Sequence, residues 1–115
     1  MKPIGDMQGK RDNVKFAFKN ATGSGSTAFV LGVAGYKIRV LALVVVALTA
    51  NTVKLETETG PAAITADMAA GATGGFTMPY SSVGWCETLS GDDLDIDQGS
   101  AVATGYTLIY EFVQD

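Results

Sequence analysis

The apolar run over residues 40–50 is the feature that most limits how this chain folds. A membrane-spanning helix needs about 20 consecutive apolar residues, whereas this run is bounded by Arg39 and by the polar segment 51–60. A soluble helix is disfavoured because the consecutive valines 44–46 lose rotamer freedom in a helix. The run therefore predicts one long strand, over residues 37–48.

Both faces of this expected strand are apolar beyond Arg39. One face would contain Ile38, Val40, Ala42, Val44 and Val46, and the other Leu41, Leu43, Val45 and Ala47. One face can fill the core, but a second face left in water would promote aggregation. We expect Leu41, Leu43 and Val45 to lie in an interface between identical subunits. The alternative is that a loop or the sheet twist of the same chain covers them.

Shorter segments on both sides of the run alternate apolar and polar residues, which is typical of half-buried strands. A turn at Gly35 and Tyr36 predicts that residues 28–33 pair with residues 37–43. Residues 61–70 fit either a short helix after their initial proline or a strand. The other expected strands cover residues 13–20, 27–34, 53–59, 76–80, 85–89, 92–99 and 101–113.

This succession of short strands predicts an all-β fold, a jelly-roll-like β-sandwich. The chain has 115 residues, of which 47% are hydrophobic, so it can form one core but hardly two. Residues 1–12 are polar and contain two glycines. We expect an extended N-terminal arm over residues 1–12 and a single domain over residues 13–115.

The composition argues against several function classes. The net charge of −4 disfavours a nucleic-acid surface, and the absence of histidine removes the commonest general base and metal ligand. Cys86 has no second cysteine to pair with, so it is expected to be a buried structural thiol, and a reducing compartment fits best. The N-terminal sequence lacks the apolar centre of a secretion signal. We expect no enzymatic activity and no cofactor.

An acidic segment near the C-terminus is the most distinctive polar feature. A calcium loop that started at Asp93 would need glycine at its sixth position and glutamate at its twelfth, where Gln98 and Thr104 stand. Two interpretations remain. The segment is a solvated strand face that protects a sheet edge from pairing, or Asp93, Asp95 and Asp97 form a weak divalent-cation site.

Two further groups of residues are candidates for binding. Most lysines and arginines precede residue 40, and Lys10, Arg11 and Lys15 are expected to dock onto a charged partner surface unless they are merely solvated. Several aromatic residues would suit a sugar-binding face, although they also suit a core or an interface. They are Phe76, Tyr80, Trp85, Tyr106 and Tyr110.

Four motifs resemble those of small bacteriophage proteins from virion gene clusters. They occupy residues 35–40 (GYKIRV), 74–80 (GGFTMPY), 84–88 (GWCET) and 105–110 (GYTLIY), and the likeness extends over about residues 28–113. Tyr36, where lysine is usual, and Cys86 depart from the pattern. The motifs are structural rather than catalytic.

The resemblance implies a jelly-roll capsid decoration, or cement, protein of the virion, assembled in the cytoplasm of the bacterial host. Such proteins often form homotrimers and clamp the major capsid protein, often through an N-terminal arm. The rival expectation is a carbohydrate- or receptor-binding module of a head fibre or tail tip. No membrane and no nucleic acid are expected as partners.

Overall fold

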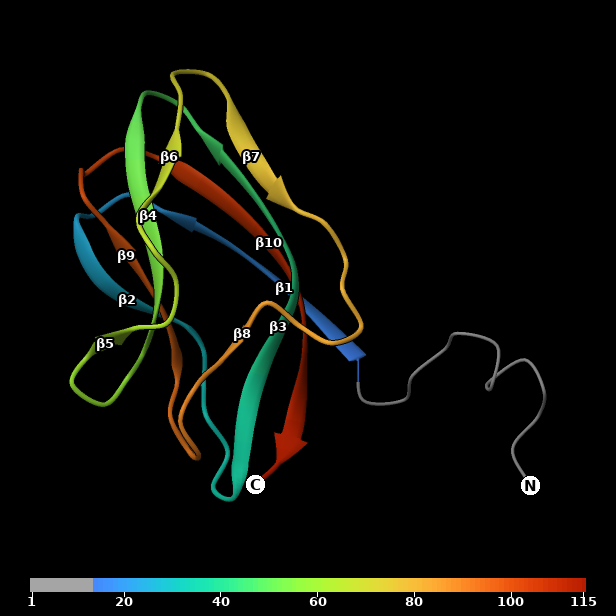
Figure 1. Ribbon diagram of the computed structural model, residues 1–115. Helices are drawn as coiled ribbons and strands as arrows, with labels where there is room; N and C mark the ends of the chain where they lie inside the picture. Colours follow the sequence, from blue (N-terminus) through green and yellow to red (C-terminus); the bar gives the residue numbers. More distant parts are fainter. Residues whose placement is uncertain (1–13) are drawn as a thin grey trace.

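The computed structural model describes residues 14–115, and this part of the chain folds into strands and loops without a helix (Figure 1). It accordingly contains no helix long and apolar enough to cross a membrane. The strands are β1 (Val14–Ala21), β2 (Gly25–Val30), β3 (Tyr36–Ala47), β4 (Asn51–Thr57), β5 (Ala62–Ala63), β6 (Met68–Ala70), β7 (Gly75–Met78), β8 (Cys86–Glu87), β9 (Leu94–Gln98) and β10 (Thr104–Gln114). The expected arm over residues 1–12 lies outside the described residues.

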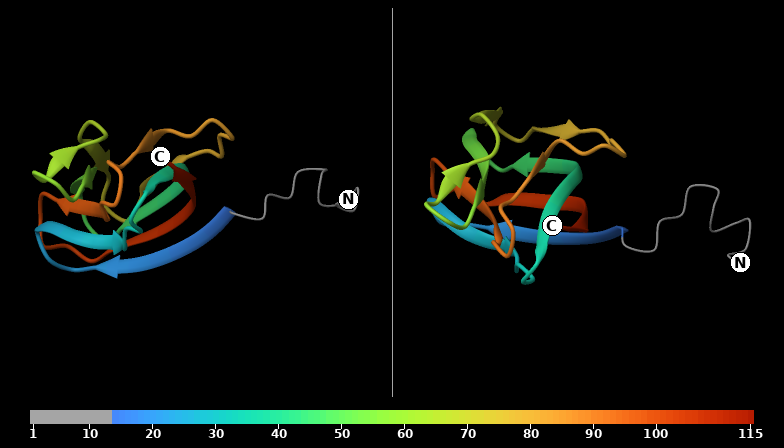
Figure 2. Two further views of the ribbon diagram at one scale, coloured as in Figure 1. Left: turned by 90° about the horizontal axis from the view of Figure 1, so that it is seen from below. Right: turned by 60° about the horizontal axis from the view of Figure 1, so that its bottom comes forward.

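The strands form two antiparallel sheets that pack face to face, as the end-on views of Figure 2 show. The first sheet has the order β1-β10-β3-β7, with β8 also on β3, and the second has the order β2-β9-β4-β5, with β6 also on β4. Successive long strands therefore alternate between the sheets, and the first strand pairs with the last. This is the strand order of a jelly roll, so the predicted fold class is confirmed.

Two sequence predictions about pairing have different outcomes. The predicted hairpin between residues 28–33 and 37–43 is wrong, because β2 pairs with β9 and β3 pairs with β10 in the other sheet. The turn at Gly35 does form, with φ of 85°, but it carries the chain from one sheet to the other. Residues 61–70 contain the short strands β5 and β6, as the strand interpretation required.

A bulge in β3 exchanges the two faces of the long strand. Tyr110 pairs with Val40 and Ile109 pairs with Ala42, so Leu41 is an extra residue without a partner on β10. An extra residue reverses the alternation of side chains. The core-facing residues are consequently Ile38 and Val40 before the bulge and Leu43, Val45 and Ala47 after it.

The bulge overturns the expected self-association surface. Leu41, Leu43 and Val45 are 0%, 1% and 0% exposed within a single chain. The second sheet supplies the cover for Leu43 and Val45 through buried residues such as Leu55 and Ile96. These three side chains are interior residues and do not face another subunit.

Candidate interaction surfaces

The first sheet has an outer face that no other part of residues 14–115 covers as a second layer. We use "outer face" for three cross-strand rows on the side turned away from the second sheet. The first row is Phe16, Ile109 and Ala42, the second is Phe18, Thr107, Val44 and Thr77, and the third is Asn20, Gly105, Val46 and Gly75. None of these residues is charged, so the outer face is a neutral and largely apolar surface.

The orientation of β1 is the unusual part of this face. Its alternation places Phe16 and Phe18 outward, each 77% exposed, and Lys15 and Lys19 on the side of the second sheet. β1 is the edge strand of its sheet, as Figure 2 also shows. Charged side chains that point inward on an edge strand discourage further strand pairing. The β1 edge is therefore protected from pairing with a further strand, while the apolar outer face remains available for contacts with another molecule.

A hollow lies at the Gly105 end of the outer face. Gly105 has no side chain, and two adjoining depressions of about 460 Å³ and 250 Å³ share Asn20, Val46 and Gly105 in their walls. Leu48 borders the larger one, and Phe18 and Lys19 border the smaller. The face thus has the protruding Phe16 ring at one end and a depression at the other, with Phe18 between them.

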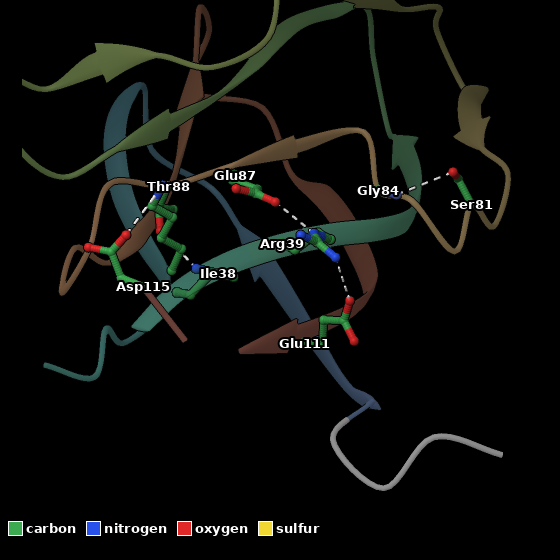
Figure 3. A network of polar contacts seen from close by, with 9 residues as sticks. Ile38, Arg39, Ser81, Gly84, Glu87, Thr88, Glu111 and Asp115 are labelled. Carbon is green, nitrogen blue, oxygen red and sulfur yellow. Dashed lines mark hydrogen bonds and ion pairs between the residues drawn. The ribbon is translucent and has the colours of Figure 1, made fainter. Parts of the chain in front are cut away.

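A cluster of charged residues on β3, β8 and β10 adjoins the first row. Arg39 Nε lies 2.7 Å from Glu87 Oε2, and Arg39 Nη1 lies 3.3 Å from Glu111 Oε2 (Figure 3). Gly84 packs on the stem of Arg39, since a Cβ on Gly84 would lie 2.5 Å from Arg39 Cγ. Arg39 therefore joins two strands that flank β3, and its positive charge is compensated by Glu87 and Glu111 within the fold.

A second apolar surface lies on the loop between β7 and β8, residues 79–85, which we call the aromatic loop. Tyr80, Val83 and Trp85 are 53%, 80% and 49% exposed. The Trp85 indole Nε1 donates a 2.7 Å hydrogen bond to Pro79 O, which holds the ring against its own loop. Two large rings and a valine are thereby presented to the solvent from one short segment.

The predicted aromatic group is divided by the structure. Tyr80 and Trp85 share the aromatic loop, whereas Tyr106 is buried and Phe76 and Tyr110 pack against the core. The alternation of β7 and β10 turns these last three rings toward the second sheet. Phe16 and Phe18 are not in the predicted aromatic group, because their exposure follows from the register of β1 on β10, which turns both rings to the outer face.

The acidic segment lies on β9, a central strand, so the prediction that it protects a sheet edge is wrong. Leu94 and Ile96 point into the core, as the alternation required, while Asp95 and Asp97 lie on the other face of β9. Asp93 comes just before the strand and accepts a 2.6 Å hydrogen bond from Gly32 N. The structure does not bring these three aspartates together as ligands. Among residues 14–115, no group of three or more histidine, cysteine or acidic side chains could hold a metal ion.

The acidic side chains instead have different structural roles. Asp92 accepts hydrogen bonds from Thr57 Oγ1 at 2.6 Å and from Thr59 N at 2.8 Å, which lower its pKa. The Thr59 hydroxyl adds a third bond, at 2.7 Å. The pKa of Asp95 is raised first by burial and then by neighbouring carboxylates, of which Asp93 contributes most, followed by Glu58 and the cross-strand partner Glu56. Asp97 lies 3.7 Å from Lys54 Nζ.

Only one of the three predicted docking cations lies among the described residues. Lys15 is exposed on β1, whereas Lys10 and Arg11 lie outside the described residues.

Burial raises the pKa of the Cys86 thiol to about 11, with a further contribution from Glu87. Cys86 is therefore a neutral thiol near pH 7, packed against the core.

Comparison with known proteins does not assign a family. No protein-family model and no curated protein matches this chain.

Proposed function

We propose that this chain is a non-enzymatic structural protein of a bacteriophage virion, a capsid decoration protein that binds the major capsid protein. The observation that carries the proposal is the arrangement of exposed apolar side chains. They form two surfaces, the outer face and the aromatic loop, on a small jelly roll whose core is already complete. The assignment to a phage virion is based on the resemblance of the four motifs to those of small bacteriophage proteins from virion gene clusters.

Apolar surfaces of this kind favour a mechanical role. Monomeric soluble proteins seldom expose large contiguous apolar patches, because burying them against a partner is favourable. A protein with two such surfaces can contact its own kind and a shell at the same time. Binding that is specific for the assembled shell stabilises the shell by mass action.

The aromatic loop is the surface we assign to the shell. Tyr80 and Trp85 have the side chains most enriched at binding hot spots, and Val83 between them is 80% exposed. Lys15, exposed on β1, adds a cation that suits an acidic partner.

The test uses capsids of the phage that encodes this chain, prepared without the protein. Purified protein should co-sediment with these shells and raise the temperature at which they open. Val83→Asp should weaken co-sedimentation at least about 10-fold, because it places a charge in the contact. Val33→Asp, at a valine that is 45% exposed on another loop, is the matched control and should bind normally. Absence of binding to the shells, or detection of the chain only in the phage tail, would contradict the proposal.

The second candidate is a carbohydrate- or receptor-binding module. It is favoured by one observation, the exposure of Tyr80 and Trp85 on the same loop, since sugars stack on aromatic rings. Glycan-array binding that Trp85→Ala abolishes would support this module and would count against the decoration role.

A further inference from the structure

We propose that the outer face is a two-fold interface with a second copy of this chain, in which the Phe16 end of each copy covers the Gly105 hollow of the other. The proposal does not depend on the role in a virion. It replaces the self-association surface that Leu41, Leu43 and Val45 cannot form.

The chemistry of the outer face suits contact with an identical surface. Its three rows contain no charged side chain, so bringing two copies together causes no repulsion between them. Interface cores are depleted in charges and enriched in aromatic residues. Phe16 and Phe18, each 77% exposed, would form such a core, while Asn20 and Thr107 supply polar contacts.

The exposed apolar area is close to what a stable dimer needs. At 77% exposure the two phenylalanines present about 300 Å², since an aromatic side chain has about 150–250 Å² of surface. Val44 and Val46, 40% and 55% exposed, together with Leu48, which borders the hollow beside the outer face and is 63% exposed, bring the total to about 450 Å². A homodimer interface of standard size buries about 800 Å² per partner, of which about 65% is apolar, or about 500 Å².

The shape of the outer face complements itself. A two-fold interface requires each contact to occur twice, with the same surface on both copies. A two-fold axis that lies between the copies and crosses the strands near Thr107 exchanges the two ends of the face. The protruding Phe16 ring then lies over the depression at Gly105, and Thr107 of one copy faces Thr107 of the other.

Other ways of pairing two copies are less favourable. Edge-to-edge pairing through β1 is opposed by Lys15 and Lys19, which point toward the second sheet. A flat sheet face can pack against only one other flat face, so this surface predicts two copies and not a closed ring of three.

The experiment is sedimentation equilibrium of the purified chain over a range of micromolar concentrations. We expect twice the chain mass of 11.9 kDa. Phe18→Lys and Thr107→Lys lie on different strands of the outer face, and each should raise the dissociation constant at least about 100-fold, because every change occurs twice in the interface. Val83→Lys, in the aromatic loop, is the matched control and should remain dimeric.

Far-ultraviolet circular dichroism and thermal melting of the variants distinguish loss of the interface from loss of the fold. Both altered side chains are exposed in the single chain, so their strand content should be unchanged. A wild-type monomer, a wild-type trimer, or a Phe18→Lys variant that stays dimeric would overturn the proposal. None of these results bears on binding to capsids, which the co-sedimentation experiment measures separately.

Discussion

The Tyr106 hydroxyl donates a 2.6 Å hydrogen bond to Gln98 Oε1, and this bond joins the two sheets inside the sandwich. Gln98 Nε2 in turn donates to Gly23 O at 2.8 Å, so the contact extends to the turn between β1 and β2. Both side chains are 2% exposed, and burial raises the pKa of the Tyr106 phenol well above its usual range. The hydroxyl therefore remains a donor throughout the physiological pH range.

Tyr106→Phe should lower the free energy of unfolding by about 1–3 kcal/mol, because the buried Gln98 oxygen loses its donor. Tyr36→Phe is the matched control. The Tyr36 side chain lies at the surface, and its ring contact with Phe112 survives the change. Urea unfolding monitored by circular dichroism measures both variants. Equal stability of the two would show that the bond between the sheets contributes nothing measurable.

Arg39→Met should destabilise the fold by about 2–3 kcal/mol. Arg39 pairs with Glu111, whose side chain is 2% exposed, and breaking a buried ion pair leaves a carboxylate without that compensation. Lys37→Met, on the same strand, removes an exposed pair with Asp115 at 3.6 Å and should cost less than about 1 kcal/mol. Thermal melting distinguishes the two, and a Lys37 variant that loses as much stability as the Arg39 variant would contradict this account.

Asp95→Asn should raise the free energy of unfolding at pH 7 by up to about 1 kcal/mol, because Asp95 opposes Glu56 across the strands. The fold raises the pKa of Asp95, so ionisation of this carboxyl opposes folding. That penalty is complete above the folded-state pKa and disappears below the unfolded-state pKa, near 4. The gain should therefore be largest at neutral pH and vanish below about pH 4.

The control for this pH dependence is Asp97→Asn. Asp97 lies on the same strand but has Lys54 at 3.7 Å, so its removal should give no gain at pH 7. Chemical unfolding at several pH values measures both curves. A gain for Asp95→Asn that persists at pH 3 would mean that charge is not its cause.

Gly75→Ala should lower the free energy of unfolding by about 1–3 kcal/mol. A Cβ at Gly75 would lie 1.7 Å from Val45 O, so the backbones of β7 and β3 would have to separate. Gly71→Ala is the control, since a Cβ there meets no atom within 4 Å, and its effect should stay within about 0.5 kcal/mol. Hydrogen exchange of the amides at the β3–β7 pairing would localise the change, and unaltered exchange there would contradict the explanation.

The sequence was sufficient to find most of the strands. The long strand predicted over residues 37–48 is β3 (Tyr36–Ala47), and the alternation of Leu94 and Ile96 correctly turns both toward the core. β-Branched content and period-two alternation are local properties of the chain, so they can be read without knowing what a strand packs against.

The tertiary structure alone decided which strands pair and which faces are buried. The bulge at Leu41 depends on the register between β3 and β10, which are far apart in the sequence, and it moved Leu43 and Val45 into the core. The outward direction of Phe16 and Phe18 depends on the register between β1 and β10, which turns Ala17 and Lys19 to the core side instead. Alternation shows that the two faces of a strand differ, but only the packing of the second sheet determines which face is inside. In the first sheet this packing left the apolar outer face on the surface.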